Sequence, residues 1–418
     1  MTQMTRADAR NAVIAGFLGW TLDAFDFFVL TFVLGSIAKD LGTDVSRIVF
    51  TLTATLMTRW VGAIIFGLLA DRFGRRLPLI INVLYYSLIE VLSGFAPNYA
   101  IFLTLRLLYG IGMGGEWGVG ASLTMESVPV RWRGILSGFL QEGYAFGYLL
   151  AAGAYFFIYP HFDAHWGWRV LFFVGGAPAL LTLFIRARVR EPEAWHRSRT
   201  DWSTYRRVAV TNWRRFLYIV LFLAAMNMVS HGSQDLYPRF LQHDRGFSVA
   251  ATSGMAAFSG VGAIFGGVLF GALSERLGRR RALIAALLLG LICIPLWLFA
   301  KTTTSLLAGG FLIQFMVQGA LGIVPAHVNE LSPDQLRGFF PGLAYQVGVL
   351  IAALSPTIEN AGAARIGYAG AMGAFAGIVI LVGVLVVLFG PEARGIPFGR
   401  SADEKPDVTE SHAAHVAL

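Results

Sequence analysis

Long apolar runs recur along the whole chain, separated by short polar or glycine-containing stretches. Many reach about 20 residues, the length that a helix needs to cross a hydrocarbon layer about 30 Å thick. They predict twelve spans, at approximately 11–37, 47–70, 77–96, 99–125, 134–160, 168–187, 215–238, 249–273, 281–300, 303–329, 338–362 and 368–390. The expected fold class is an all-α membrane protein with twelve transmembrane helices.

Composition supports this interpretation. The chain has 418 residues, of which 56% are hydrophobic and 14% charged, whereas a soluble globular chain has about a quarter charged residues. Its 48 glycines are expected in membrane helices, where small residues allow close helix contact. The single cysteine, Cys293, has no partner and indicates neither a disulfide nor a metal site.

The net charge of +8 is unevenly distributed. About 24 Lys and Arg residues lie in the termini and the loops that follow even-numbered spans, and about 6 lie in the opposite loops. This asymmetry predicts that both termini are cytoplasmic. We expect the chain to lie in the plasma membrane, as a bacterial inner-membrane protein. It accounts for the surplus of positive charge without nucleic-acid binding.

Two sequence stretches occur twice at one spacing. GLLADRFGRR (67–76) recurs as GALSERLGRR (271–280), and ESVPVRWRG (126–134) recurs as ELSPDQLRG (330–338), both 204 residues later. A duplication of six helices predicts two bundles, at 1–187 and 215–390. The remaining parts are a basic cytoplasmic linker at 188–214 and a polar tail at 391–418, which we expect to be disordered.

The first stretch resembles the signature loop G-x-L-x-D-R-x-G-R-R of the major facilitator superfamily, and RLLYGIGMGGEWG (106–118) resembles the fourth-helix motif of that superfamily. The resemblance implies the major facilitator fold. In the loop itself, Asp71 can accept hydrogen bonds from an arginine or from the N-terminus of a neighbouring helix. The residues to which the resemblance assigns gating or structural roles are Gly67, Asp71, Arg72, Gly74, Arg75, Arg76, Arg106, Gly271, Glu275, Arg276, Gly278 and Arg279.

Ionisable residues inside the predicted spans need an explanation, because each costs roughly 2.5–3.5 kcal/mol at the membrane centre. Span one places Asp23 and Asp26 three residues apart on one face, and span two places Arg59 near its middle. A guanidinium can clamp a carboxylate with two hydrogen bonds, and an anionic substrate would complete a buried cation that lacks a permanent partner. A permanent salt bridge from Arg59 to Asp23, Asp26 or Glu90 is the alternative.

Span seven ends in NMVSHGSQD (227–235), which carries a stripe of polar side chains. Asn227, Ser230, His231, Gln234 and Asp235 follow helical spacing and lie on one face. His231 and Asp235 are one turn apart and can hydrogen-bond, and histidine titrates closest to physiological pH. The stripe predicts a proton carrier in a cavity between the two bundles; a hydrogen-bond network that only packs helices is the alternative.

The same stretch resembles N-x-x-[S/T]-H-x-[S/T]-Q-D-x-x-x-T, the signature of the sialate:proton symporter family, which includes lactate/pyruvate permeases and sialic acid transporters. The opening GWTLDAFDFF also resembles this family. The lactate-permease branch implies substrate roles for Arg59, Phe146 and Gln346. Arg239 replaces the last threonine of the signature, and Val349 stands where that branch often has asparagine.

The sequence therefore predicts a secondary transporter, not an enzyme, that moves a small monocarboxylate with a proton by alternating access. Arg59, Phe146, Asn227, Gln234 and Gln346 would bind substrate. A separate set would carry the proton: Asp23, Asp26, His231 and Asp235. A sialic acid or aromatic-acid symporter of the same fold is the first alternative, followed by a multidrug exporter and a sensor that transports nothing. We expect no cofactor or metal, membrane lipid as surroundings, and a monomer.

Overall fold

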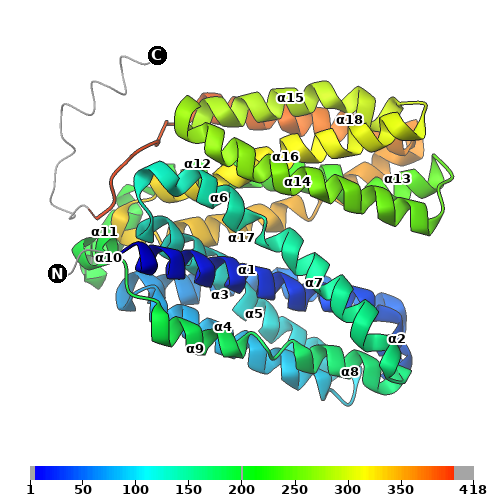
Figure 1. Ribbon diagram of the computed structural model, residues 1–418, viewed down its shortest axis with the longest axis horizontal. Coiled ribbons are helices and arrows are strands. Elements are labelled where there is room, and N and C mark those ends of the chain that lie inside the picture. The colour runs from blue at the N-terminus through cyan, green and yellow to red at the C-terminus, as the bar shows by residue number, and fades with distance from the viewer. Residues whose placement is uncertain (1–4, 199–200, 400–418) are drawn as a thin grey trace.

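The computed structural model describes residues 5–198 and 201–399, which form helices and turns and contain no strand. Figure 1 shows two helical bundles lying side by side. The first contains α1 (Arg6–Phe32), α2 (Leu34–Asp40), α3 (Val45–Phe73), α4 (Arg76–Gly94), α5 (Tyr99–Ser127), η1 (Val130–Trp132), α6 (Arg133–Gln141), α7 (Gly143–Ile158), η2 (Tyr159–His161), α8 (Ala164–Val174) and α9 (Ala179–Arg188). The linker forms α10 (Glu193–Ser198) and α11 (Trp202–Thr211). The second bundle contains α12 (Trp213–Gln234), α13 (Tyr237–His243), α14 (Val249–Leu277), α15 (Arg279–Phe299), α16 (Thr303–Leu331), η3 (Asp334–Leu336), α17 (Phe339–Ala352) and α18 (Ser355–Leu388).

Polar side chains begin several of the long helices. Thr5 accepts a hydrogen bond from the Asp8 backbone while the Asp8 side chain accepts one from the Thr5 backbone, so that α1 starts with a capping box. Asn98 caps α5 and Thr302 caps α16 in the same way, with a side-chain oxygen that accepts a bond from a free N–H of the first turn. These caps set where each membrane helix begins.

Helices cover the ranges of all twelve predicted spans, and five of these ranges contain more than one helix. The fifth span breaks at Glu142, between α6 and α7. Spans eleven and twelve meet inside α18, where Gly367 has a φ of 72° that side chains with a Cβ rarely adopt. Among the described residues, nine helical segments are long and apolar enough to cross a membrane, and the segment Phe339–Leu388 covers two predicted spans.

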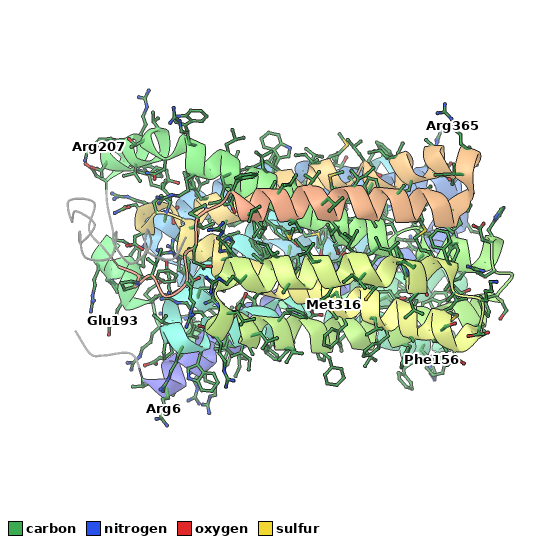
Figure 2. The ribbon with its side chains drawn as sticks, turned by 90° about the horizontal axis from the view of Figure 1, so that it is seen from above. Arg6, Phe156, Glu193, Arg207, Met316 and Arg365 are labelled. Carbon is green, nitrogen blue, oxygen red and sulfur yellow. The ribbon has the colours of Figure 1, made fainter. Side chains whose placement is uncertain are left out.

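The helix ends define two ends of the molecule. Figure 2 shows Arg6, Glu193 and Arg207 at one end and Phe156 and Arg365 at the other. We call the first the basic end; it also carries the α3–α4, α5–α6, α14–α15 and α16–α17 junctions. We call the other the far end; it carries α2, α8 and α13 (Figure 1).

The two bundles pack on one another mainly through two short helices, α6 and α17. In one direction α6 packs against α14 and α16, and in the other α17 packs against α3 and α5. In contrast α7, which continues α6 toward the far end, packs against α1 and α8 of its own bundle. The ribbons of the two bundles accordingly approach each other near the basic end and diverge toward the far end (Figure 1).

The first part of the tail packs against the basic end. The sequence predicts disorder from residue 391, but residues 391–399 contact both bundles, and Phe398 lies against a cluster that includes Met125 and Ala326. Arg133 also donates a hydrogen bond to the Ile396 carbonyl over 2.7 Å. The apolar and aromatic residues of this segment find burial there; residues 400–418 lie outside the described part of the chain.

Candidate functional site

The repeated sequence motifs form the same ion-pair arrangement in both bundles. Arg75 donates two hydrogen bonds to Glu126, over 3.1 and 2.8 Å, and one to Asp71 over 2.6 Å. Its counterpart Arg279, 204 residues later, donates to Glu330 over 2.9 and 3.0 Å and to Glu275 over 2.9 Å. Such two-pronged bonds are the strongest that a guanidinium makes, so each motif fixes the basic end of its own bundle.

The acidic residue of each motif also binds the other bundle. Asp71 accepts bonds from the backbone N–H groups of Gly338, over 2.7 Å, and Phe339, over 3.1 Å, at the start of α17. Glu275 accepts one from the N–H of Gly134 at the start of α6. Free N–H groups at a helix N-terminus favour a carboxylate. The interaction predicted for Asp71 is therefore found, and it joins the two bundles.

Glycine is needed at these motif positions for two physical reasons. A Cβ on Gly67 would lie 2.8 Å from the Cα of Phe339, and one on Gly271 would lie 2.4 Å from the Gly134 carbonyl oxygen, so larger residues would push the bundles apart. Gly74 and Gly278 have φ angles of 101° and 93°, a conformation that a side chain disfavours.

The remaining basic residues of the motifs lie nearby. Arg72 is half-buried at the end of α3. Arg76 donates to the Arg186 carbonyl, and the carbonyl of Arg276 accepts a bond from Arg394 over 3.0 Å.

Several residues that join the two bundles at the basic end lie outside the signature loop. Arg133 lies 3.7 Å from Glu330 of the other bundle, and its repeat counterpart Arg337 lies 3.4 Å from Glu126. The ring centroid of Phe398 lies 3.4 Å from the Arg133 Cζ and 3.6 Å from the Arg337 Cζ. The duplication of ESVPVRWRG as ELSPDQLRG was the signal for the four charged residues; no repeat marks Phe398.

Two more carboxylates cap helices at the basic end. Glu191 accepts bonds from the N–H groups of Arg75 and Arg76, over 2.7 and 2.9 Å, and Glu392 accepts bonds from those of Arg279 and Arg280, over 3.1 and 3.0 Å. Burial raises the pKa of Glu191 above its ordinary value, although the bonds from Arg75 and Arg76 act in the opposite direction. Both lie outside the repeated motifs, Glu191 in the linker and Glu392 in the tail, so the motifs did not identify them.

Arg59 lies at the middle of α3 and faces the interior of the first bundle. Its side chain is 4% exposed, and its Nε and Nη2 atoms are buried without a hydrogen-bond partner. A Cβ on Gly114 would lie 1.7 Å from the Arg59 carbonyl oxygen, so the glycine lets α5 approach this point of α3. Among the described residues no salt bridge within 4.0 Å involves Arg59. The permanent salt bridge to an acidic residue, the alternative from the sequence, is therefore not found in the described part of the chain.

The charge of Arg59 nevertheless acts on several groups around it: the carboxyl groups of Asp23 and Glu116, and the phenols of Tyr144 and Tyr345. Tyr345 belongs to the second bundle. Tyr144 is also within the electrostatic reach of Asp235, on α12 of the second bundle. Tyr144 is therefore within electrostatic reach of charged groups from both bundles.

A buried acidic group lies beside Arg59, on α1 and α4. Asp23 and Asp26 are fully buried, and their side-chain oxygens have no hydrogen-bond partner among the described residues. Glu90 instead accepts a bond from Arg106 over 2.6 Å, which agrees with a structural role for Arg106. The charge of Arg59 acts on Asp23 and that of Arg106 acts on Asp26, so each carboxyl group is within reach of a different arginine.

Aromatic rings and amides close the centre of the molecule. Trp117 and Tyr345 stack across the two bundles with ring centroids 4.0 Å apart, and Trp20 stacks on Tyr144 at 5.6 Å. Gln346 donates a bond from Nε2 to the Gly114 carbonyl over 3.2 Å, while its Oε1 is buried without a partner. The amide predicted to bind substrate thus lies next to the turn of α5 that contacts Arg59.

The polar stripe of α12 divides into two parts. The His231 Nδ1 and the Asp235 Oδ2 lie 3.0 Å apart, with side chains 33% and 32% exposed, so the predicted hydrogen bond forms in a partly exposed position. Asn227 donates to the Leu223 carbonyl of its own helix over 2.8 Å. Gln234 donates to Gln314 of α16 over 2.8 Å. The two amides are bonded within their own bundle, as expected for a packing network.

Phe146 and Tyr144 point in different directions from α7. Phe146 is 37% exposed and makes an edge contact with Phe17, at 5.6 Å between ring centroids. Tyr144 contacts Trp20 and Phe28 and lies within reach of Arg59. Of the two aromatic residues, Tyr144 is the one that the structure places at the centre, and Phe146 is not brought together with Arg59.

Comparison with known proteins places the chain among transporters. The model of a family described as "Sugar (and other) transporter" matches residues 11–217 and again residues 216–397. A probable 4-methylmuconolactone transporter of Cupriavidus pinatubonensis is 30% identical, over 91% of this chain and 90% of its own length. The sialic acid transporter NanX of Escherichia coli is 29% identical, over 84% of this chain and 86% of its own length.

A carboxylic acid transporter protein homolog of Saccharomyces cerevisiae is 29% identical over 84% of this chain, and the match spans 61% of the yeast protein. Among solved structures, the proton:xylose symporter XylE of the major facilitator superfamily superposes with a TM-score of 0.76, covering 94% of this chain and 98% of that one at 20% identity. That structure shows that the fold is the one expected from the signature loop.

Proposed function

Because this chain belongs to the sugar (and other) transporter family and has the major facilitator fold, we propose that it is a secondary transporter that moves a small monocarboxylate together with a proton. The observation that carries the proposal is the unpaired guanidinium of Arg59 at the middle of the molecule. A buried cation with free donors is costly, and a bound carboxylate would fill two of them in the geometry that a guanidinium prefers.

The groups around Arg59 suit a small anion. Gln346 has a free amide oxygen next to α5, and Tyr144 and Tyr345 are within reach of the guanidinium charge. Arg59 would hold the carboxylate, Gln346 would bond a hydroxyl of the substrate, and Tyr144 would bound the pocket. Asn227 and Gln234 would bind the substrate only after breaking their present hydrogen bonds. Phe146 would influence the pocket without touching the substrate.

Proton coupling is assigned to the His231–Asp235 pair and to the Asp23–Asp26 pair. The first pair is partly exposed and hydrogen-bonded, so that its charge can change with external pH. The second is buried within reach of the charges of Arg59 and Arg106, where an arriving anion would change the balance of charge. A proton that enters with a monoanion gives electrically neutral movement, so a pH gradient alone can drive accumulation.

The basic end is proposed to be the cytoplasmic end, in a bacterial inner membrane. Its surplus of Arg residues follows the rule for cytoplasmic loops. With bonds from Asp71 and Glu275 joining the bundles there, the conformation described is closed toward the cytoplasm. Opening it would require these bonds to break while the far ends approach each other.

The names of the relatives support an organic acid as cargo, since they include a carboxylic acid transporter homolog and a methylmuconolactone transporter. A sialic acid or aromatic-acid symporter is the second candidate. It is favoured by the similarity to a sialic acid transporter and by the rings of Trp20, Trp117 and Tyr345 at the centre.

The test uses purified protein in liposomes with an imposed inward proton gradient. Lactate, pyruvate, acetate, benzoate and N-acetylneuraminate compete for uptake of radiolabelled pyruvate, and each is then tested directly. Accumulation of lactate or pyruvate that collapses with a protonophore supports the proposal. Accumulation of benzoate or N-acetylneuraminate alone selects the second candidate, and uptake that ignores the proton gradient removes proton coupling.

A further inference from the structure

The first turns of α18 carry a buried carboxyl group that none of the roles above uses. Glu359 is 1% exposed, and neither of its side-chain oxygens has a hydrogen-bond partner. An ionised carboxylate without donors in an apolar interior costs several kcal/mol. Glu359 therefore needs either a ligand or a proton.

Glu359 lies against the polar stripe of α12. A Cβ built on Gly232 would lie 3.4 Å from the Glu359 Oε1 and 2.5 Å from a ring carbon of Phe375. Gly232 directly follows His231, and the absence of a side chain is what lets the carboxyl approach the helix at this position. The carboxyl thus lies next to the backbone turn that holds the His231–Asp235 pair.

The charged groups around Glu359 do not supply a cation for it. On α12, Asp235 is close enough for its charge to act on Glu359, and Asp235 is in turn bonded to His231. On α13, Arg239 lies over the Tyr368 ring at 5.3 Å, and His243 is bonded to Asp244.

The other described helices near Glu359 also provide no positively charged partner for it. On α16, Gln314 is neutral and bonded to Gln234. The arginines at the start of α15 lie at the basic end, Arg365 is near the far tip of α18 (Figure 2), and α17 has no charged residue. Within the described part of the chain, Glu359 thus lies near a second carboxyl group, Asp235, which is bonded to the base His231.

We propose that Glu359 is the residue that binds the transported proton, and that the more exposed His231–Asp235 pair passes the proton to it. The inference rests on the proposed function and deepens it, because that function leaves open where the proton resides. In the step, an N–H bond of the His231 imidazolium breaks and an O–H bond forms on the Glu359 carboxylate, with water carrying the proton between them. Imidazole and a neutral carboxylic acid are the products.

The first test needs no substrate. Infrared difference spectra between neutral and alkaline pH detect the carbonyl stretch of a protonated carboxylic acid, and subtracting the Glu359→Gln spectrum from the wild-type spectrum isolates the band of this residue. A band present at neutral pH and lost on alkalinisation supports the proposal. Identical spectra of the two proteins would overturn it.

The second test separates binding from coupling in liposomes, with radiolabelled pyruvate as the probe. Glu359→Gln keeps the volume of the side chain but cannot titrate, so we expect exchange of internal for external substrate to continue while accumulation driven by a pH gradient is lost. Glu359→Asp should restore part of the accumulation. The control is Asn360→Ala, on the same turn, which should accumulate substrate like the wild type.

Two results would contradict the assignment. One is gradient-driven accumulation by Glu359→Gln at the wild-type level. The other is loss of both exchange and accumulation in a folded Glu359→Gln protein, which would make Glu359 a substrate contact or a packing residue. If the wild type itself shows no dependence on protons, the proposed function fails, whereas the infrared result still decides whether Glu359 is protonated.

Discussion

Trp117 of α5 and Tyr345 of α17 stack with ring centroids 4.0 Å apart and an interplanar angle of 16°, although they belong to different bundles. The stack lies beside Gln346, which bonds to the Gly114 carbonyl. It also lies between the central arginine and the bonds of the basic end. Any motion that opens the basic end has to separate these two rings.

The first prediction follows from this stack. An aromatic pair contributes about 0.5–1.5 kcal/mol beyond burial, so Tyr345→Ala should shift the equilibrium about 2- to 12-fold toward molecules open at the basic end. Distances between spin labels placed across the basic end measure this shift. Tyr148→Ala, on α7 and away from the stack, is the control, and an unchanged distance distribution in Tyr345→Ala would mean that the stack does not hold the closed state.

The tail contact makes a second prediction. Phe398 is bound by Arg133 and Arg337, one from each bundle, and each cation–π contact is worth about 0.5–2 kcal/mol. Phe398→Ala should therefore also populate the state open at the basic end, which the same spin-label distances detect. Phe389→Ala removes a ring that is 84% exposed and should have no effect. Equal behaviour of the two variants would contradict a clamping role for the tail.

A third prediction concerns His231. His231→Gln removes the base that is bonded to Asp235 but keeps a polar side chain of similar size. If His231 is the entry point for the proton, as proposed, uptake should lose its dependence on external pH. His243→Gln, an exposed histidine that is also bonded to an aspartate, is the matched control. A His231→Gln protein with the wild-type pH profile would remove this residue from the proton path.

Stability at the far end depends on Asp40. Burial raises the pKa of Asp40, but bonds from Arg169, His165 and Trp168 outweigh burial and leave the pKa below its ordinary value. A carboxyl group with a lowered pKa stabilises the fold above its unfolded pKa of about 3.9, and the stabilisation is lost as pH falls through the lower folded value. Asp40→Asn should therefore lower the Tm at neutral pH.

The same measurement at several pH values provides the control. Circular dichroism in detergent should give Tm values for wild type and Asp40→Asn that converge as the pH falls below about 4. Asp44→Asn should leave the Tm unchanged, because Asp44 makes no side-chain capping bond at the start of α3. A difference between wild type and Asp40→Asn that is the same at all pH values would exclude the ionic explanation.

Much of the fold could be predicted from the sequence, because apolar length and repeated motifs report local and symmetric features. Arg75 and Glu126 are 51 residues apart, as are Arg279 and Glu330, so the duplicated motifs contain both partners of each ion pair. The hydrogen bond between His231 and Asp235 was predictable for a similar reason, since one helical turn separates them.

Features set by packing between distant helices were not predictable in this way. The rotation of α7 decides that Tyr144 and not Phe146 lies near Arg59, and it depends on the close contact of Gly147 with the α1 backbone at Thr21. The contact of Phe398 with both bundles and the position of Glu359 against Gly232 are also tertiary. No periodicity in the sequence marks either of them.

The central claim is that Arg59 binds the carboxylate of the substrate, and it is tested most directly by uptake of the panel acids into liposomes that contain Arg59→Ala. Hydrogen bonds to a charged group are worth about 1.5–3 kcal/mol, so binding should weaken at least about tenfold, and uptake should be lost. The Arg47→Ala control removes an arginine from the far end of the same helix, and its uptake should match the wild type. Wild-type uptake by a folded Arg59→Ala protein would contradict the account.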